Sequence, residues 1–172
     1  MEFDNCSFHQ CDFSETEFKH CKFIDCHFSN CNLSNIKIGY SRFNEVFFEQ
    51  CKILGVDWTR AYWPNLSLSS PLKFSNCILN DCSFHGLQLP ELQLISCKVM
   101  DVDFREGCFN KANFSGSDFS YSLFNHTELI EADFRDAANY SIDIYQNSIK
   151  HGKFSRDEAF NLLSGLNIEL DD

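Results

Sequence analysis

Large apolar residues recur at every fifth position along most of this chain of 172 residues. Residues 112–124 read ANFSGSDFSYSLF, in which Phe114, Phe119 and Phe124 stand five positions apart. An α-helix would place apolar residues about 3.6 positions apart and a β-strand about two apart, so neither element explains the spacing. Self-similarity at a fixed short period predicts a solenoid, in which each unit stacks against its neighbours.

Two registers carry this period through the chain. The first holds fourteen consecutive large apolar residues from Phe3 to Leu68, and the second holds thirteen from Phe74 to Phe134. Sixteen of the nineteen Phe and both Trp occupy this one position, which indicates that it faces a common interior. The step between the registers is six residues, so one extra residue enters near residues 69–71.

Pro64 and Pro71 lie beside the point where the registers change. Because proline has no backbone N–H for a strand ladder, it marks a corner or a break. We interpret this stretch as a kink with no room for a long loop. The predicted division is an N-terminal part of the solenoid (1–68), a break or kink (69–73), a C-terminal part (74–139) and a C-terminal cap (140–172).

The position two residues before the large residue holds nine of the ten cysteines, and elsewhere it is mostly Ala, Ser, Thr or Val. Side chains two apart in an extended chain point to the same side, so each unit sends one large and one small side chain inward. Cysteines stacked in neighbouring layers of a solenoid would be near enough to bridge in principle. We nevertheless expect reduced core thiols, because free cysteine packs as a small hydrophobe. Reduced thiols are typical of the cytoplasm.

The five-residue unit follows the pattern small–(Asp/Asn)–(Leu/Phe)–polar–any. Good matches are CDFSE (11–15), CNLSN (31–35), ANFSG (112–116), SDFSY (117–121) and ADFRD (132–136). On these motifs the chain resembles the pentapeptide-repeat family over roughly residues 1–140. The resemblance implies an all-β fold, a right-handed quadrilateral β-helix with four units per coil. Twenty-seven units then make about seven coils.

The five-residue period ends after Asp136. Ser155–Glu158 reads as a capping box before an apolar run, which predicts a short helix to about Leu163 that stops at Gly165. We expect this helix to cap the last coil and to offer a two-fold contact between copies of the chain. The residues predicted to form its apolar dimer contact are Phe160, Leu162, Leu163 and Leu166.

The tail also resembles the C-termini of bacterial quinolone-resistance and microcin-immunity proteins of this family. Ile142–Ile144, Asn147, Ile149, Glu158–Ala159 and Leu162–Leu163 carry the match. The resemblance implies a homodimer joined through the C-terminal end. It also implies DNA gyrase or topoisomerase IV as partner, bound by a rod that mimics the width and negative charge of duplex DNA.

The chain is strongly acidic, with a formal net charge of −11 at pH 7. Residues 1–136 hold nineteen acids and eleven bases, so most of the excess lies on the repeats. Direct binding of nucleic acid is not expected, because phosphate contacts need Lys and Arg. Charges interrupt every apolar stretch, so we expect no signal peptide, no membrane span and a cytoplasmic protein.

Catalytic and cofactor motifs are absent from the sequence. It contains no G-x-x-x-x-G-K-[ST], H-E-x-x-H or G-x-G-x-x-G motif, and none of its six histidines has a Ser and an Asp at a triad spacing. The sequence contains no C-x-x-C motif that would indicate a zinc site. An interior filled with Phe leaves no obvious pocket. We therefore predict no enzyme, no cofactor, no metal and no catalytic residue.

Two functions are compatible with these sequence features. The first is an acidic rod that binds gyrase or topoisomerase IV as a DNA mimic and protects it from quinolones or a peptide toxin, or modulates its response to them. The alternative is a structural or interaction scaffold with another protein partner. For the first function, the acids predicted from their positions to mimic phosphates are Asp81, Asp101, Asp103 and Glu106.

Overall fold

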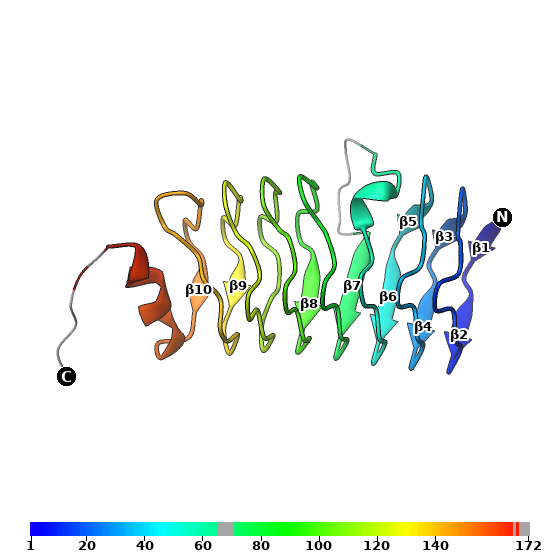
Figure 1. Ribbon diagram of the computed structural model, residues 1–172, viewed down its shortest axis with the longest axis horizontal. Helices are drawn as coiled ribbons and strands as arrows, with labels where there is room; N and C mark the ends of the chain where they lie inside the picture. Colours follow the sequence, from blue (N-terminus) through cyan, green and yellow to red (C-terminus); the bar gives the residue numbers. More distant parts are fainter. Residues whose placement is uncertain (65–70, 167, 169–172) are drawn as a thin grey trace.

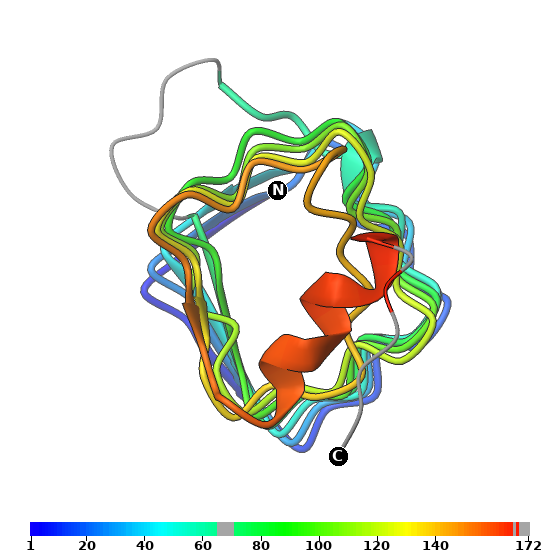
Figure 2. The same ribbon diagram turned by 90° about the vertical axis from the view of Figure 1, so that its left-hand side faces the viewer.

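The computed structural model describes residues 1–64, 71–166 and 168. The chain winds into a rod of about seven stacked coils (Figure 1). Seen along its axis, the rod has four sides, and the coils superimpose closely from end to end (Figure 2). The predicted quadrilateral β-helix is thereby confirmed.

Short parallel strands mark two sides of the rod. Phe3 pairs with Phe23 and Phe8 with Phe28, so each residue lies beside the one twenty positions later. One sheet runs β1-β3-β5, a second runs β2-β4-β6-β7-β8, and β10 pairs with β9. The strands are β1 (Glu2–Asp4), β2 (Ser7–His9), β3 (Lys22–Ile24), β4 (His27–Ser29), β5 (Arg42–Asn44), β6 (Val46–Glu49), β7 (Leu72–Ser75), β8 (Gln93–Ile95), β9 (Asp133–Phe134) and β10 (Lys153–Phe154). The 3₁₀ helices are η1 (Trp58–Arg60) and η2 (Glu158–Leu166).

The corners of the rod explain the period of five. The last residue of nearly every unit has a positive φ, as at Glu15 (60°) and Asp101 (56°). This left-handed conformation turns the chain through the corner and points that side chain outward. The Asp of the motif supports the turn, because Asp118 Oδ1 accepts a hydrogen bond of 3.0 Å from the Ser120 N–H. Asp12 and Ser14 make the same contact at 2.9 Å.

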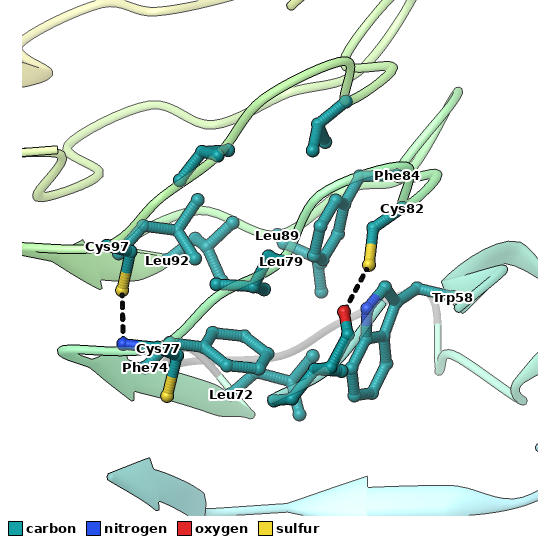
Figure 3. Packing of buried hydrophobic residues seen from close by; sticks show 14 of the residues in the cluster. Trp58, Leu72, Phe74, Cys77, Leu79, Cys82, Phe84, Leu89, Leu92 and Cys97 are labelled. Carbon is teal, nitrogen blue, oxygen red and sulfur yellow. Dashed lines mark hydrogen bonds between the residues drawn. The ribbon is translucent and has the colours of Figure 1, made fainter. Parts of the chain in front are cut away.

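Stacked aromatic rings fill the interior. Phe104 lies between Phe84 and Phe124, with ring centroids 5.4 and 5.1 Å away and nearly parallel planes. Phe84 in turn stacks on Trp58 at 5.9 Å, and Phe74 meets the same indole edge-on at 5.6 Å (Figure 3). Phe84, Phe104 and Trp58 are fully buried. The repeat therefore builds one continuous apolar core along the rod.

The break between the two registers differs from its prediction. One extra residue would stack Phe74 on Ile53, whereas the structure pairs Phe74 with Phe48, twenty-six positions earlier. Six residues are therefore inserted into this coil instead of one. The prediction failed because Leu68, which lies outside the described residues, was counted as a repeat unit. η1 begins at Trp58, which is fully buried in the core, and the teal residues that follow η1 lead away from the side of the rod (Figure 2).

The rod also continues beyond the point where the sequence period ends. β10 pairs with β9, so Phe154 lies on Phe134 with ring centroids 5.3 Å apart. The bridge between Glu128 and Ser148 has the same twenty-residue offset, whereas the bridge between Phe124 and Ile142 has an offset of eighteen. The twenty-residue offset is therefore regained at β10 although the five-residue motif is lost, and Tyr140 fills the interior one position out of register.

The C-terminal helix lies across the end of the rod, as Figure 2 shows. It is a 3₁₀ helix that continues through Gly165 to Leu166, so the predicted stop is wrong. The capping box also takes another form. Ser155 Oγ accepts from the Asp136 N–H at 2.7 Å, and the Glu158 carboxylate accepts from the Asn139 N–H at 3.3 Å. Both side chains therefore attach the helix to the preceding coil.

All ten cysteines are free thiols, and seven of them are buried. Cys97 Sγ accepts a hydrogen bond of 3.4 Å from the Cys77 N–H one coil away, and Cys82 Sγ donates to the Ile53 carbonyl at 3.0 Å (Figure 3). Burial raises the pKa of the Cys82 thiol to about 12. The cysteines thus serve as small core residues.

Candidate protein-binding surface

Two of the predicted acids stack at one corner of the rod. Asp81 and Asp101 both have a positive φ, and both are exposed. The Asp81 N–H donates to the Met100 carbonyl at 3.0 Å, which places the two corners one coil apart. Tyr121 holds the next place in this column and is 77% exposed. The column therefore presents two adjacent carboxylates followed by an aromatic ring.

The other two predicted acids lie on the adjoining side and corner. Asp103 forms isolated bridges with Ser83 and Leu123, while Glu106 occupies the next corner. His85 lies between their carboxylates, with Nδ1 3.7 Å from Asp103 and Nε2 3.8 Å from Glu106. The structure thus brings these two acids together around one imidazole.

Asp103 forms an ion pair with Arg105, a residue of the same five-residue unit. Arg105 Nη2 lies 2.8 Å from Asp103 Oδ2, and Arg105 Nε lies 2.9 Å from Oδ1. This bidentate contact holds the pKa of the Asp103 carboxyl below its ordinary value. Only 23% of the Asp103 side chain is exposed, against 67% for Glu106. Asp103 therefore contributes less free negative charge than its position in the sequence predicts.

Acidic residues do not form an unbroken stripe along the corners. One column of successive corners contains Glu91, Lys111, Glu131 and His151, all with outward positions. At the opposite end of the rod, Asp25 and Glu45 stack as a second exposed pair. The described surface therefore offers short acidic pairs that alternate with neutral and basic residues.

The predicted dimer contact divides into buried and exposed parts. Leu162 is partly buried and packs against the core cluster of the rod. Leu163 and Leu166 are also half-buried, whereas Phe160 is 60% exposed. Phe160 is thus the member of the predicted set that is available for contact with another molecule.

The described residues offer no candidate site for a metal ion and no candidate membrane span. Within the described ranges, no group of three or more His, Cys, Asp or Glu side chains could hold a metal ion. No helix in that part of the chain is long and apolar enough to cross a bilayer.

Sequence reasoning missed the partners of the acids. The triplet Asp103-Phe104-Arg105 places its two charged side chains on the same outward face, because residues two apart in an extended unit point alike. Asp133 and Arg135 repeat this contact at 2.6 Å. The Asp-Phe-Arg triplet in both units was the sequence signal for these ion pairs. No sequence signal predicted the contact of His85 with Asp103 and Glu106, since it depends on how the coils stack.

Comparison with known proteins agrees with the fold. The family model for the pentapeptide repeat region matches residues 1–70 and 56–134. No curated protein sequence matches the chain. A trypsin-treated form of QnrB1, a plasmid-mediated fluoroquinolone resistance protein, is 19% identical, covers 100% of this chain and 92% of that chain, and has a TM-score of 0.64. Full-length QnrB1 is also 19% identical, with 97% and 90% covered and a TM-score of 0.51.

Proposed function

Because the chain belongs to the pentapeptide-repeat family, we propose that it is a non-enzymatic binding protein whose target is DNA gyrase or topoisomerase IV. In this proposal the rod occupies the basic surface that normally receives duplex DNA. It thereby protects the enzyme from quinolones or a peptide toxin, or alters its response to them. The proposal places the protein in the bacterial cytoplasm as a homodimer joined through η2.

The observation that carries the proposal is the stacked pair of exposed carboxylates at Asp81 and Asp101. Corners one coil apart are separated by about 4.8 Å, the spacing of neighbouring strands. Phosphates along one DNA strand are about 3.4 Å apart along the axis. A cationic surface that binds closely spaced phosphates can also bind two neighbouring carboxylates, and the backbone of the rod holds their two corners in place, which reduces the entropy lost on binding.

The four predicted acids contribute unequally in this proposal. Asp81 and Asp101 have no ion pair within the described part of the chain, and Glu106 has only a distant imidazole. Asp103 is neutralised by Arg105, so its main role is to hold the side of the rod in shape. The likeness of the fold to trypsin-treated QnrB1, a fluoroquinolone resistance protein, extends along the whole chain and is compatible with the proposal.

Binding of the chain to immobilised gyrase tests the proposal. Reversing the charge of the pair, in Asp81→Lys/Asp101→Lys, should weaken binding about tenfold or more, because steering and contact are both lost. The matched control is Asp25→Lys/Glu45→Lys, which makes the same change in charge at the stacked acidic pair near the other end. Equal affinity for all three proteins would refute DNA mimicry at this corner.

A scaffold for a different protein partner is the second candidate. The mixed corner column of Glu91, Lys111, Glu131 and His151 favours it, because a long DNA-like surface would have acids at successive corners. Gyrase binding that is absent from wild-type protein at high micromolar concentration, with the rod folded, would favour this alternative.

A further inference from the structure

We propose that a groove beside η1 binds an acidic peptide segment of a partner protein. The groove, called here the η1 groove, has a volume of about 900 Å³ and adjoins a smaller hollow that shares Tyr40 and Tyr62. It lies between the side of the rod and the residues that follow η1, among them Ala61, Tyr62 and Trp63. The regular repeats alone therefore predicted no pocket. This surface is separate from the acidic corners of the proposed gyrase contact.

The charge of the η1 groove opposes that of the whole chain. Its walls and the adjoining hollow contain five basic residues and two acidic ones, whereas the chain carries −11. The basic residues are Lys19, Lys22, Lys37, Arg42 and Arg60, and the acidic ones are Glu17 and Asp57. A local positive surface on an acidic protein concentrates negatively charged partners at that place.

Three of these cations have no carboxylate of their own. Lys22 pairs with Glu2 at 3.0 Å and Arg60 with Asp57 at 3.0 Å. In contrast, no carboxylate among the described residues lies within ion-pair distance of the other three, which are Lys19, Lys37 and Arg42. The η1 groove therefore has cationic groups available for an external anion.

Exposed aromatic rings line the η1 groove and the adjoining hollow, and one of them holds a cation of the hollow in place. Arg42 lies over the Tyr62 ring, with Cζ 4.3 Å from the centroid. His20 and Tyr40 stack at 5.1 Å, and their planes differ by only 9°. A guanidinium fixed over a ring loses less freedom when it binds a carboxylate. The groove thus combines preorganised cations with apolar contact area, as sites for acidic peptides require.

Two features favour a peptide over a single-stranded nucleic acid. Glu17 and Asp57 line the groove and would repel a phosphate at every nucleotide. A peptide can instead place neutral side chains opposite those two acids and carboxylates opposite the cations. The net charge of the chain also disfavours a long polyanion more than a short segment.

Fluorescence anisotropy of a labelled peptide of alternating Glu and Phe tests the proposal. We expect saturable binding that weakens with salt and falls about tenfold or more in Lys19→Glu/Lys37→Glu/Arg42→Glu. The matched control is Lys98→Glu/Lys111→Glu/Lys150→Glu, which changes three exposed lysines elsewhere by the same charge and should bind normally. An alanine version of the groove variant serves if the charge reversals impair folding.

The intrinsic fluorescence of Trp63 is an independent measurement of where the peptide binds. Trp63 is half-buried and lines the η1 groove, while Trp58 is fully buried in the core. Peptide binding should therefore change the intrinsic fluorescence, and Trp63→Phe should abolish that change while retaining binding. Absence of binding, equal losses in the two triple variants, or tighter binding of oligothymidylate than of the peptide would overturn the proposal.

Discussion

Phe74 stacks on Phe48 with ring centroids 4.9 Å apart and planes within 10° of parallel, although twenty-six residues separate them. Elsewhere along the rod, as at Phe28 on Phe8, stacked rings are twenty residues apart. The core is therefore continuous across the insertion. The two registers of the sequence form one rod.

Deleting residues 65–70 should leave the rod folded. The deletion removes the six residues by which the offset exceeds twenty, and it leaves Trp63 and Phe74 separated as in a regular unit. Since loop length affects stability only slowly, we expect a native circular dichroism spectrum and a melting temperature within a few degrees of wild type. Loss of the spectrum would show that the register assigned across the insertion is wrong.

Phe104→Ala should strongly destabilise the rod. The ring is fully buried between Phe84 and Phe124, so its removal leaves a cavity in the middle of a column. The expected cost in the free energy of unfolding is about 3–5 kcal/mol, measured by urea denaturation. Tyr121→Ala, at an exposed corner, should change it by only about 0.5 kcal/mol. Similar costs for both variants would contradict the assignment of inward and outward positions.

Thiol reactivity should divide the cysteines into two classes. Cys6, Cys11 and Cys108 are partly exposed, and the other seven are buried. A thiol reagent at neutral pH should therefore modify three cysteines in the native protein and the remaining seven only after denaturation. Mass spectrometry of digested protein identifies the sites. Rapid labelling of Cys51 or Cys77 in the folded protein would contradict the burial of these two thiols in the core.

The free energy of unfolding should also decrease in alkaline solution. Burial raises the pKa of Cys82 to about 12, from an ordinary value of 9.0. As the pH rises above 9.0, the unfolded chain loses this proton while the folded chain keeps it, so unfolding is favoured. Replacing Cys82 with Ala should reduce the slope of stability against pH in this range, as chemical denaturation at several pH values can measure. An unchanged slope would argue against the burial of this thiol.

Phe160→Glu should disrupt the proposed dimer. Phe160 is exposed on η2 at the end of the rod, and a charge there would be buried in a two-fold contact. Sedimentation velocity should show a dimer for wild type and a monomer for the variant. Tyr145→Glu, at another exposed aromatic residue, is the control and should stay dimeric. A monomeric wild-type protein would contradict the proposed homodimer.

The sequence was sufficient to predict the core and most of the fold. Phe114 and the other large apolar residues of the repeat occur at fixed positions because each unit places one large side chain in the interior. Their burial confirms this prediction. The insertion was harder to place, since Leu68 continues the five-residue period in the sequence five positions after Trp63, which does stack on Phe43. The last coil was missed because Phe154 keeps the stacking offset without the five-residue motif, while Tyr140 fills the interior one position out of register.

The surface was less predictable than the core. Outward residues are not selected by packing, so their partners depend on stacking between coils and on the insertion. The bidentate contact of Arg105 with Asp103 lies within one unit and had a signal in the D-F-R triplet. The η1 groove had no such signal in the sequence. The contact of Arg42 with Tyr62 depends on the irregular residues that follow η1, which the repeat does not predict.

The most direct test of gyrase binding is DNA supercoiling by purified gyrase in the presence of this protein, with and without a quinolone. If the rod competes with DNA at the enzyme, supercoiling or quinolone-induced cleavage should fall as the protein is added. The Asp81→Lys/Asp101→Lys variant should be much less effective, whereas Asp25→Lys/Glu45→Lys should act like wild type. Supercoiling and cleavage that remain unchanged at high micromolar concentrations of folded protein would contradict gyrase binding.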